Sequence, residues 1–353
     1  MLALLCINKY NFNSLCCVLF INDLLKKCKT LIIIMILLLT CDGDLSCDLV
    51  IDWLNYYRHE YIRINSFELF SKNICFSQEN GKLRLLLDNQ NIPIETIKSI
   101  WYRKFGFFEE SEFYKNLLTN FNYDIIKHIT KEYYKILNLF LLSLKNKKWI
   151  TNPFHSNLNK FAVLQLAGKC GLNIPNSYIS NNFNFIENNK NYIVKSVVDP
   201  IIAEYKENKC MMYTTQLTSD DQNSIPDVFF PSLIQEKIEK EYEIRIFYLM
   251  GKCYSMAIFS QNDKKTKLDF RQYNWEKPNR YVPYNLSKND LSKIKLLMNS
   301  LKLNCGSIDL IMGIDSKLYF LEINPTGQFG MVDFPCNYGL HKKIAETLIE
   351  MDV

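Results

Sequence analysis

Three oxygen-bearing side chains near the C-terminus stand in two short apolar segments and could together hold a divalent cation. Asp309 lies in the first segment, and Glu322 and Asn324 lie in the second. Because strand residues two apart share a face, a hairpin with its turn at 313–316 brings all three side by side. Mg²⁺ prefers such oxygens together with phosphate and water. The alternative is that Asp309 ends a strand and Glu322 is a solvated strand residue, but an unpaired acid inside an apolar run is costly to bury.

These two segments, GSIDL and YFLEINPTGQFG, resemble the metal-binding end of the ATP-grasp ligases, which join a carboxylate to a nucleophile through an acyl-phosphate. The resemblance implies an α/β (α+β) protein with the ATP-grasp fold. Such a protein has an N-terminal α/β pre-ATP-grasp domain, a central subdomain, and a C-terminal subdomain that binds ATP and Mg²⁺. The resemblance also implies two magnesium ions at Asp309, Glu322 and Asn324. The other motifs of an ATP-grasp site occur upstream in the expected order.

Two lysines match positions that contact nucleotide phosphates in this family. Lys195 is the single lysine of the apolar strand expected at 191–197. An edge-strand lysine that discourages aggregation is the alternative for this position. Lys160 stands at the start of a helix that has an apolar stripe and ends before Gly171. A solvated helix lysine is the alternative for Lys160.

The segment at 233–238 resembles the linker whose backbone binds the adenine edge, which assigns Glu236, Lys237 and Ile238 to ATP binding. Glu243 matches the acid that binds the ribose hydroxyls, an arrangement strengthened by charge. Arg245 is two residues further on, shares its face and is likewise assigned to ATP binding. Without the resemblance, Glu243 and Arg245 could equally form a solvated ion pair of small energetic value.

The segment at 268–273 alternates so that a strand there would place Asp269 and Arg271 on one face and Phe270 on the other. The resemblance implies that Arg271 reaches the phosphate being transferred, because guanidinium is planar, bidentate and always charged. Arg271 and Lys195 are therefore the expected catalytic pair. A simple Asp–Arg pair is the alternative.

The N-terminal half reads as a small parallel α/β unit. A strand from Met35, a helix at 50–57 and a strand at 61–65 come first, followed by a strand at 99–104 and a helix at about 124–145. The segments VIDWLNYY, YIRIN and IWYRK resemble the N-terminal domain of graspetide synthetases, and the C-terminal segments resemble the grasp-with-spasm ATP-grasp peptide maturases. Trp101, Tyr102 and Arg103 are candidates for peptide contact, or else core residues at a strand end.

This family resemblance implies a ligase that uses ATP and Mg²⁺ to link Glu or Asp side chains of a ribosomally made precursor peptide to Ser or Thr hydroxyls, or to Lys amines, of the same peptide. A radical-SAM/SPASM protein encoded nearby and a homodimer are further partners that it suggests. Two alternatives are a ligase that adds amino acids to a protein, as ribosomal-protein glutamate ligases do, and a non-catalytic ATP-binding protein of the synapsin type.

The expected division of the chain starts with a spurious extension at 1–34, with translation beginning at Met35. An N-terminal α/β domain on the peptide-binding side (35–150), a central subdomain (151–235) and a C-terminal subdomain with the metal site (236–353) follow. The apolar run at 31–39 is too short to span a bilayer. It also supplies the first strand. A real hydrophobic anchor is the alternative.

Composition favours a cytoplasmic enzyme. The 353 residues include 42 basic and 37 acidic side chains, for a net charge of +5, with no basic block that would indicate nucleic acid as a partner. The 12 cysteines form no CxxC pairs, which is typical of reduced thiols. We therefore expect neither a nucleic-acid nor a membrane partner. The four histidines are too scattered in sequence to propose as metal ligands.

Overall fold

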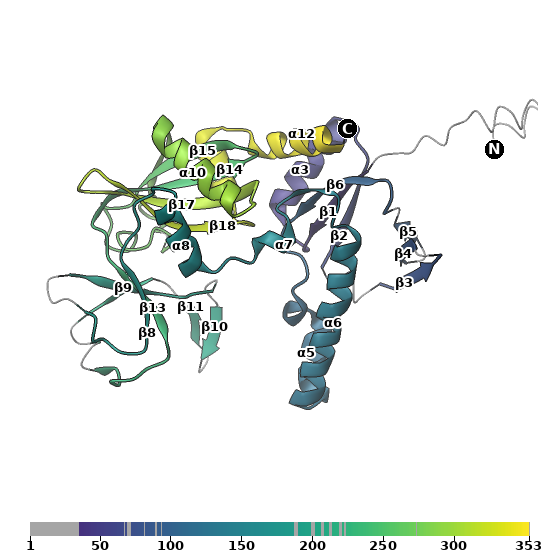
Figure 1. Cartoon of the computed structure of the whole chain (residues 1–353), viewed down its shortest axis with the longest axis horizontal. Coiled ribbons are helices and arrows are strands. Elements are labelled where there is room, and N and C mark those ends of the chain that lie inside the picture. Colours follow the sequence, from purple (N-terminus) through teal and green to yellow (C-terminus); the bar gives the residue numbers. More distant parts are fainter. Residues whose placement is uncertain are drawn as a thin grey trace, which may run out of the picture.

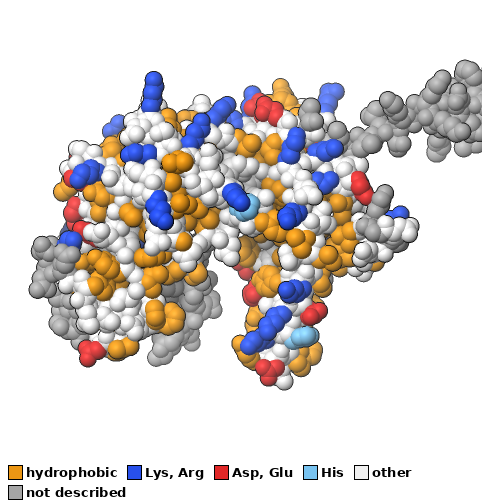
Figure 2. Space-filling view, in the orientation of Figure 1, with side chains coloured by type: hydrophobic (Ala, Val, Ile, Leu, Met, Phe, Trp, Pro, Cys, Tyr) orange, Lys and Arg blue, Asp and Glu red, His pale blue; other side chains and the backbone are white. Residues whose placement is uncertain are grey.

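The computed structural model describes residues 35–352, apart from 67, 69–71, 81, 89, 93, 187–189, 199–201, 206–207, 212–213, 219–220, 222–223 and 273. The predictions for residues 1–34 lie outside the described residues. In the described part of the chain, no helix combines the length and the apolar character needed to cross a bilayer. On the face drawn in Figure 2, lysine and arginine side chains are scattered and do not gather into one basic patch.

The N-terminal part is built on a parallel four-stranded sheet with the order β2-β1-β6-β7. Its strands are β1 (Met35–Thr40), β2 (Tyr61–Asn65), β6 (Ile97–Tyr102) and β7 (Lys148–Ile150). Almost all of β1 is buried, as expected for a strand covered on both faces. The predicted parallel α/β unit is thus confirmed, with its first helix, α3 (Leu45–Tyr56), starting earlier than expected.

Helices on the face of this sheet opposite α3 form an arm that projects from the molecule (Figure 1). They are α5 (Glu112–Asn120) and α6 (Tyr123–Ser143), preceded by the short helix η1 (Phe108–Glu110). A small antiparallel sheet lies beside them, made of β3 (Ile74–Glu79), β4 (Lys82–Leu87) and β5 (Gln90–Ile92). Apolar side chains of these elements and of β1 share one core.

The middle of the chain forms a second sheet, antiparallel, with the order β12-β9-β13-β8. Its strands are β8 (Ser177–Ser180), β9 (Tyr192–Lys195), β12 (Thr215–Leu217) and β13 (Ser232–Glu236), and we call it the small sheet. A separate hairpin, β10 (Ile202–Tyr205) and β11 (Asn208–Met211), accompanies it. Because β9 pairs on both sides, Lys195 is not on an edge strand, which excludes the aggregation-blocking alternative.

The C-terminal sheet has the order β16-β15-β14-β17-β18 and is antiparallel. Its strands are β14 (Lys240–Leu249), β15 (Lys252–Phe259), β16 (Arg280–Tyr284), β17 (Cys305–Gly313) and β18 (Leu318–Asn324). One face is covered by α8 (Lys160–Lys169) and α10 (Lys288–Ser300). Helix α8, placed by sequence in the segment 151–235, therefore packs on the C-terminal sheet. A short helix, α7 (Pro153–Ser156), leads into it.

The other face of the C-terminal sheet shares a core with the N-terminal sheet. Helices α11 (Gly330–Cys336) and α12 (Leu340–Asp352) contribute to this core together with α3. In Figure 1, α12 lies beside α3, and the Ser99 hydroxyl of β6 donates to the Leu348 carbonyl at 3.0 Å. The last helix therefore ties the end of the chain to the N-terminal domain, an arrangement that the predicted boundary at 236–353 did not include.

Strand β14 shows how the sheet joins its core to a polar site. Ile244 and Ile246 are buried against α8 and α10, whereas Phe247 and Leu249 are buried on the opposite face. Glu243 and Arg245 lie on the same face as Phe247, because side chains alternate along a strand. The part of this face that packs against the N-terminal domain is apolar. The part of it beyond that contact, at Glu243 and Arg245, is polar.

The buried ion pair between Arg103 and Asp44 offers a test of the N-terminal packing. Arg103 Nε lies 2.7 Å from Asp44 Oδ2, and both side chains are nearly fully buried. Arg103→Ala leaves the Asp44 carboxylate buried without its partner, so we expect it to lower the free energy of unfolding by about 3–5 kcal/mol. Urea unfolding measures this.

The pair between Arg63 and Asp48 is the matched control because it is partly exposed. Arg63→Ala should cost at most about 1 kcal/mol. Equal losses in the two variants would contradict the account of a buried, structural Arg103.

Candidate active site

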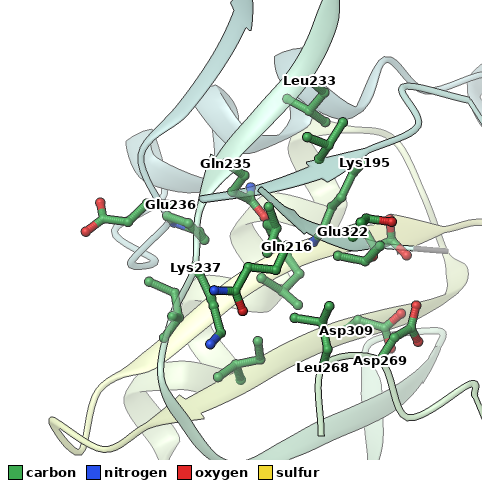
Figure 3. A pocket seen from close by; sticks show the side chains of 18 of the residues that line it. Lys195, Gln216, Leu233, Gln235, Glu236, Lys237, Leu268, Asp269, Asp309 and Glu322 are labelled. Atoms are coloured by element: carbon green, nitrogen blue, oxygen red, sulfur yellow. The ribbon is translucent and has the colours of Figure 1, made fainter. Parts of the chain in front are cut away.

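A cavity of about 900 Å³ lies between the small sheet and the C-terminal sheet. This volume is within the range of about 300–1,000 Å³ that is usual for small-molecule sites. Figure 3 shows the cavity with side chains from both sheets pointing toward it. The predicted site residues that line it are Lys160, Lys195, Glu236, Lys237, Ile238, Glu243, Arg271, Asp309 and Glu322.

Two carboxylates face each other at one end of the cavity. Asp309 on β17 is paired directly with Glu322 on β18, in a register that shifts just after Asp309. Arg245, directly opposite Asp309 on β14, forms an ion pair with it. Burial raises the pKa of Asp309, and the negative charge of Glu322 adds to this while Arg245 opposes it.

Asn324, the third predicted metal ligand, is oriented by a turn. It pairs with Ser307 across the hairpin, and its side-chain oxygen accepts a hydrogen bond from the Thr326 amide at 3.0 Å. Asn324 is not among the residues that line the cavity. The structure therefore brings Asp309 and Glu322 together and places Asn324 beside them on the strand, engaged with its own loop.

Three cationic side chains surround Glu322. Lys160 Nζ lies 3.4 Å from the Glu322 carboxylate. Burial alone would raise the pKa of Glu322, but Lys160, Lys195 and Arg271 together outweigh it and hold this pKa below its usual value. Burial lowers the pKa of Lys195, with Glu322 opposing the shift. The positively charged side chains therefore lie around the end of the cavity that holds the two carboxylates.

Arg271 is held by Asp269 in a loop and not, as predicted, on a strand. Residues 268–271 lie outside any strand, and Asp269 accepts from the Arg271 backbone at 3.0 Å and from Nε and Nη2 at 2.8 and 2.6 Å. These hydrogen bonds hold the pKa of Arg271 above its usual range. The predicted strand is wrong because the aspartate accepts from its own local backbone, which favours a turn. The two side chains nevertheless meet.

The segment after β13 crosses from the small sheet to the C-terminal sheet along the cavity. Figure 3 shows Lys237 directed toward the cavity and the Glu236 carboxylate turned away from it. That carboxylate accepts a hydrogen bond from Asn176 at 2.6 Å. At Glu236 it is therefore the backbone that faces the cavity, in keeping with a linker whose backbone geometry matters more than its side chains.

Glu243 has two partners that sequence reasoning missed. Lys240 Nζ lies 2.5 Å from one of its oxygens, and the Ser260 hydroxyl donates to the other at 2.5 Å. Burial raises the pKa of Glu243, and Lys240 opposes this. Residues three apart lie on opposite faces of a regular strand, but a bulge between Lys240 and Tyr242 brings Lys240 round to the side of Glu243.

The donor set fits a divalent cation that is shared with a ligand. In the residues that the structure describes, no group of three or more His, Cys, Asp or Glu side chains is placed to hold a metal ion. Two opposed carboxylates are present, and Mg²⁺ commonly binds one or two carboxylates and takes its other ligands from phosphates and water. A cation held by Asp309 and Glu322 would also offset the burial and the repulsion from Glu322 that together raise the pKa of Asp309.

The candidate peptide-contacting residues lie mostly in the core. Trp101 and Arg103 are 2% and 3% exposed, and the Arg103 guanidinium lies 5.3 Å from the centre of the Trp101 ring. The Tyr102 hydroxyl donates to the Phe105 carbonyl at 2.9 Å, and burial raises its pKa to about 12. These placements favour the alternative reading of core residues at the end of a strand.

Comparison with known proteins matches the N-terminal domain to one family. Residues 35–157 match the family model described as the MvdD pre-ATP grasp domain. No curated protein matches the chain.

Solved structures of similar shape cover nearly the whole described chain. A Chryseobacterium gregarium RiPP-associated ATP-grasp ligase in complex with ADP and a leader and core peptide has a TM-score of 0.80 at 23% identity, covering 90% of this chain and 96% of its own. The macrocyclase MdnC of Microcystis aeruginosa, bound with precursor peptide MdnA, has a TM-score of 0.75 at 22% identity, with coverages of 90% and 99%. The ATP-grasp ligase PsnB, complexed with minimal precursor, Mg and ADP, has a TM-score of 0.71 at 16% identity, with coverages of 90% and 97%.

The sheets, the cavity between them and these likenesses agree with one another. The chain has the ATP-grasp fold, and its residues 35–157 are similar to the MvdD pre-ATP grasp domain.

Proposed function

We propose that this protein is an ATP-dependent ligase that matures a ribosomally made peptide. It activates Glu or Asp side chains of the peptide as acyl-phosphates and joins them to Ser or Thr hydroxyls, or to Lys amines, of the same peptide. The observation that carries the proposal is the cavity in which the pair Asp309 and Glu322 faces Lys160, Lys195 and Arg271. Solved structures of the same fold with ADP or precursor peptides bound support it.

ATP binding in the cavity would use groups from both sheets. The backbone at Glu236, Lys237 and Ile238 lies along the side expected to hold adenine. A carboxylate has about four lone-pair sites, so Glu243 can bond to Lys240 and Ser260 and still accept from two ribose hydroxyls. Lys160, Lys195 and Arg271 then meet the phosphates at the end of the cavity where the carboxylates lie.

Asp309 and Glu322 would hold magnesium, with Asn324 as a further ligand if its turn opens. When bound, magnesium neutralises the triphosphate and draws charge from the γ-phosphoryl group. Arg271 and Lys195 stabilise the negative charge that builds on the transferred group. Arg245 holds Asp309 in place and balances its charge before the cation arrives.

The peptide carboxylate attacks the γ-phosphoryl group, which gives an acyl-phosphate and ADP. A hydroxyl or amine of the same peptide then displaces phosphate and closes the ring. Since both partners belong to one chain, their effective concentration is high, and the enzyme has mainly to position them and exclude water. In the proposed division of labour, 35–150 faces the peptide, and 151–235 and 236–353 enclose ATP.

The cytoplasm is the proposed place of action, because ATP and newly made peptides are available there. A homodimer and a radical-SAM/SPASM partner encoded nearby belong to the proposal on the strength of the sequence resemblance.

The test is a mass measurement on a peptide encoded beside the gene and rich in Ser or Thr and Glu or Asp. With purified protein, ATP and magnesium, each link should remove the mass of one water. A mass gain equal to an amino acid would instead identify the glutamate-ligase alternative. No change in the peptide, with ATP bound but not consumed, would favour the synapsin-type alternative.

Glu243 and Glu236 are predicted to differ sharply although both line the cavity. Glu243→Gln weakens charge-assisted hydrogen bonds to ribose, so we expect the KM for ATP to rise about 10-fold or more. Glu236→Gln is the matched control and should leave this KM nearly unchanged, because its carboxylate is turned toward Asn176. Steady-state kinetics with varied ATP measure both, and a larger effect at Glu236 would contradict the assignment.

A further inference from the structure

A second cavity, of about 520 Å³, opens at the carboxyl ends of β1 and β6. It is lined by the loop that follows β1, by Lys104 after β6, and by Gln328, Phe334 and His341 from the C-terminal part. The chain leaves β1 through α3 on one face and leaves β6 through α5 and α6 on the other. Ligands of open α/β sheets bind at such a point, where the strand order reverses.

A buried histidine–aspartate pair lies at this cavity. His341 Nδ1 is 2.6 Å from Asp333 Oδ2, and both side chains are 6% exposed. The ring lies between Phe329 and Phe334, with centroid distances of 4.7 and 5.4 Å. Asp333 also accepts from the backbone of Leu340 at 2.8 Å, which fixes the carboxylate. With Nδ1 engaged, Nε2 is the ring nitrogen left for a ligand.

The charge state of Asp333 suits this arrangement. Burial would raise its pKa, but the hydrogen bond from His341 and the amides at the start of α12 outweigh burial and lower the pKa below its usual value. An ionised carboxylate on Nδ1 keeps the proton on that nitrogen and leaves Nε2 as an acceptor. The pair can therefore act as a base, His341, with Asp333 as the group that orients it.

One strand, β17, links the carboxylate pair to a residue that lines the second cavity. Ser307 and Asp309 share a face of β17 and are about 7 Å apart along it. The Ser307 hydroxyl donates to the carbonyl of Gln328, which lines the second cavity, at 3.2 Å. The loop lies tightly on the strand, because a Cβ at Gly327 would come within 2.6 Å of the Ser307 Cβ. The loop after β18 thus connects Gln328, at the second cavity, to the strand that carries Asp309.

We propose that the second cavity receives the nucleophile of the peptide and that His341, oriented by Asp333, is the general base for ring closure. This inference rests on the proposed function and adds to it the residue that takes the proton. In the proposed function Asp309 and Glu322 would hold a cation and Arg271 would contact phosphate, so none of the three is assigned as that base.

In this step the hydroxyl oxygen attacks the carbonyl carbon of the acyl-phosphate while its proton moves to Nε2 of His341. The bond between that carbon and the phosphate oxygen then breaks, and its electron pair leaves with phosphate. The imidazolium returns its proton to the departing phosphate or to water. A neutral lysine amine reacts in the same way, losing its proton after attack.

A purely structural role for the pair predicts different results. Asp333 accepts from the first amides of α12, as a helix N-cap does, and His341 fills the space between two aromatic rings. Asp333→Asn keeps an oxygen for the cap but presents an amide donor to Nδ1, which reverses the ring tautomer. Under a structural role this variant should be active.

The experiment separates the two halves of the reaction in the full-length protein. Acyl-phosphate formation is followed with the neighbouring-gene peptide, ATP, magnesium and hydroxylamine, which traps the intermediate as a hydroxamate. Ring closure is followed by loss of water without hydroxylamine. The variants are His341→Gln and Asp333→Asn, with the exposed His128→Gln on α6 as the matched control, and thermal unfolding checks that each is folded.

We expect His341→Gln to slow ring closure about 100-fold or more while hydroxamate formation continues. Asp333→Asn should slow the same step, and His128→Gln neither step.

Unchanged ring closure in folded His341→Gln, or equal loss of both half-reactions, would overturn the assignment of the base. If the unsubstituted enzyme forms no hydroxamate, the proposed function itself fails, and this inference fails with it. If it forms the hydroxamate and only the two variants fail to close the ring, both stand.

Discussion

Replacing Arg271 with alanine is expected to slow acyl-phosphate formation by about 10³-fold or more, the scale typical of an arginine that stabilises a transferring phosphoryl group. The guanidinium is bidentate to Asp269 and remains charged at any working pH. Its side chain still reaches the cavity, where it lowers the pKa of Glu322. The measurement is single-turnover release of ADP in the presence of peptide.

Arg271→Ala also leaves Asp269, which is 5% exposed, without its main partner. A second variant, Asp269→Asn, separates this structural effect from the chemical one, because it disturbs the pair but keeps the positive charge. We expect Asp269→Asn to lose far less activity than Arg271→Ala. Full activity in folded Arg271→Ala would contradict the role assigned to the guanidinium.

Glu322→Gln is expected to remove nearly all activity, by about 10²–10³-fold in kcat, because it takes away one of two charges that would hold the cation. It keeps the shape of the side chain, and the pKa of Asp309 should fall because Glu322 contributes to raising it. The variant should also need more magnesium for half-maximal rate. A magnesium titration of ADP release measures both effects.

Glu350→Gln on the exposed side of α12 is the control for charge loss in general, and it should behave like the unsubstituted enzyme. Wild-type magnesium dependence in Glu322→Gln would rule out Glu322 as a ligand.

The pairing of Asp309 with Glu322 could be expected from sequence because it depends on two local regularities. Strand alternation and a short hairpin turn restrict which side chains can meet, and the apolar residues around Glu322 mark the strand clearly. The same reasoning gave the buried β1 and the strand that carries Lys195. In each case, the pattern of a few consecutive residues was sufficient.

Residues brought together by irregular backbone were beyond such reasoning. Lys240 reaches Glu243 only because a bulge shifts the strand by one residue. Asp269 and Arg271 meet through a turn, although the alternation of residue types at 268–273 predicted a strand. Neither arrangement produces a repeating pattern of apolar and polar residues, because each depends on one local departure from regular backbone geometry.

Contacts between distant segments were also hidden. Helix α12 packs on α3. His341 and Asp333 meet at the second cavity, which is also lined by the residues that come directly after β1. Four scattered histidines give no sign of which one is buried beside a carboxylate. The sequence left Trp101 and Arg103 open as either peptide contacts or core residues, and only the structure shows that Phe329 from the C-terminal part covers both.

The most direct test of the central claim is a crystal structure of the protein with magnesium and a non-hydrolysable ATP analogue. The account predicts adenine against the backbone of 235–238 and a metal ion that bridges the phosphates to Asp309 and Glu322, with Arg271 and Lys195 on the terminal phosphate. Nucleotide bound outside the cavity between the two sheets, or a metal ion that touches neither carboxylate, would contradict it.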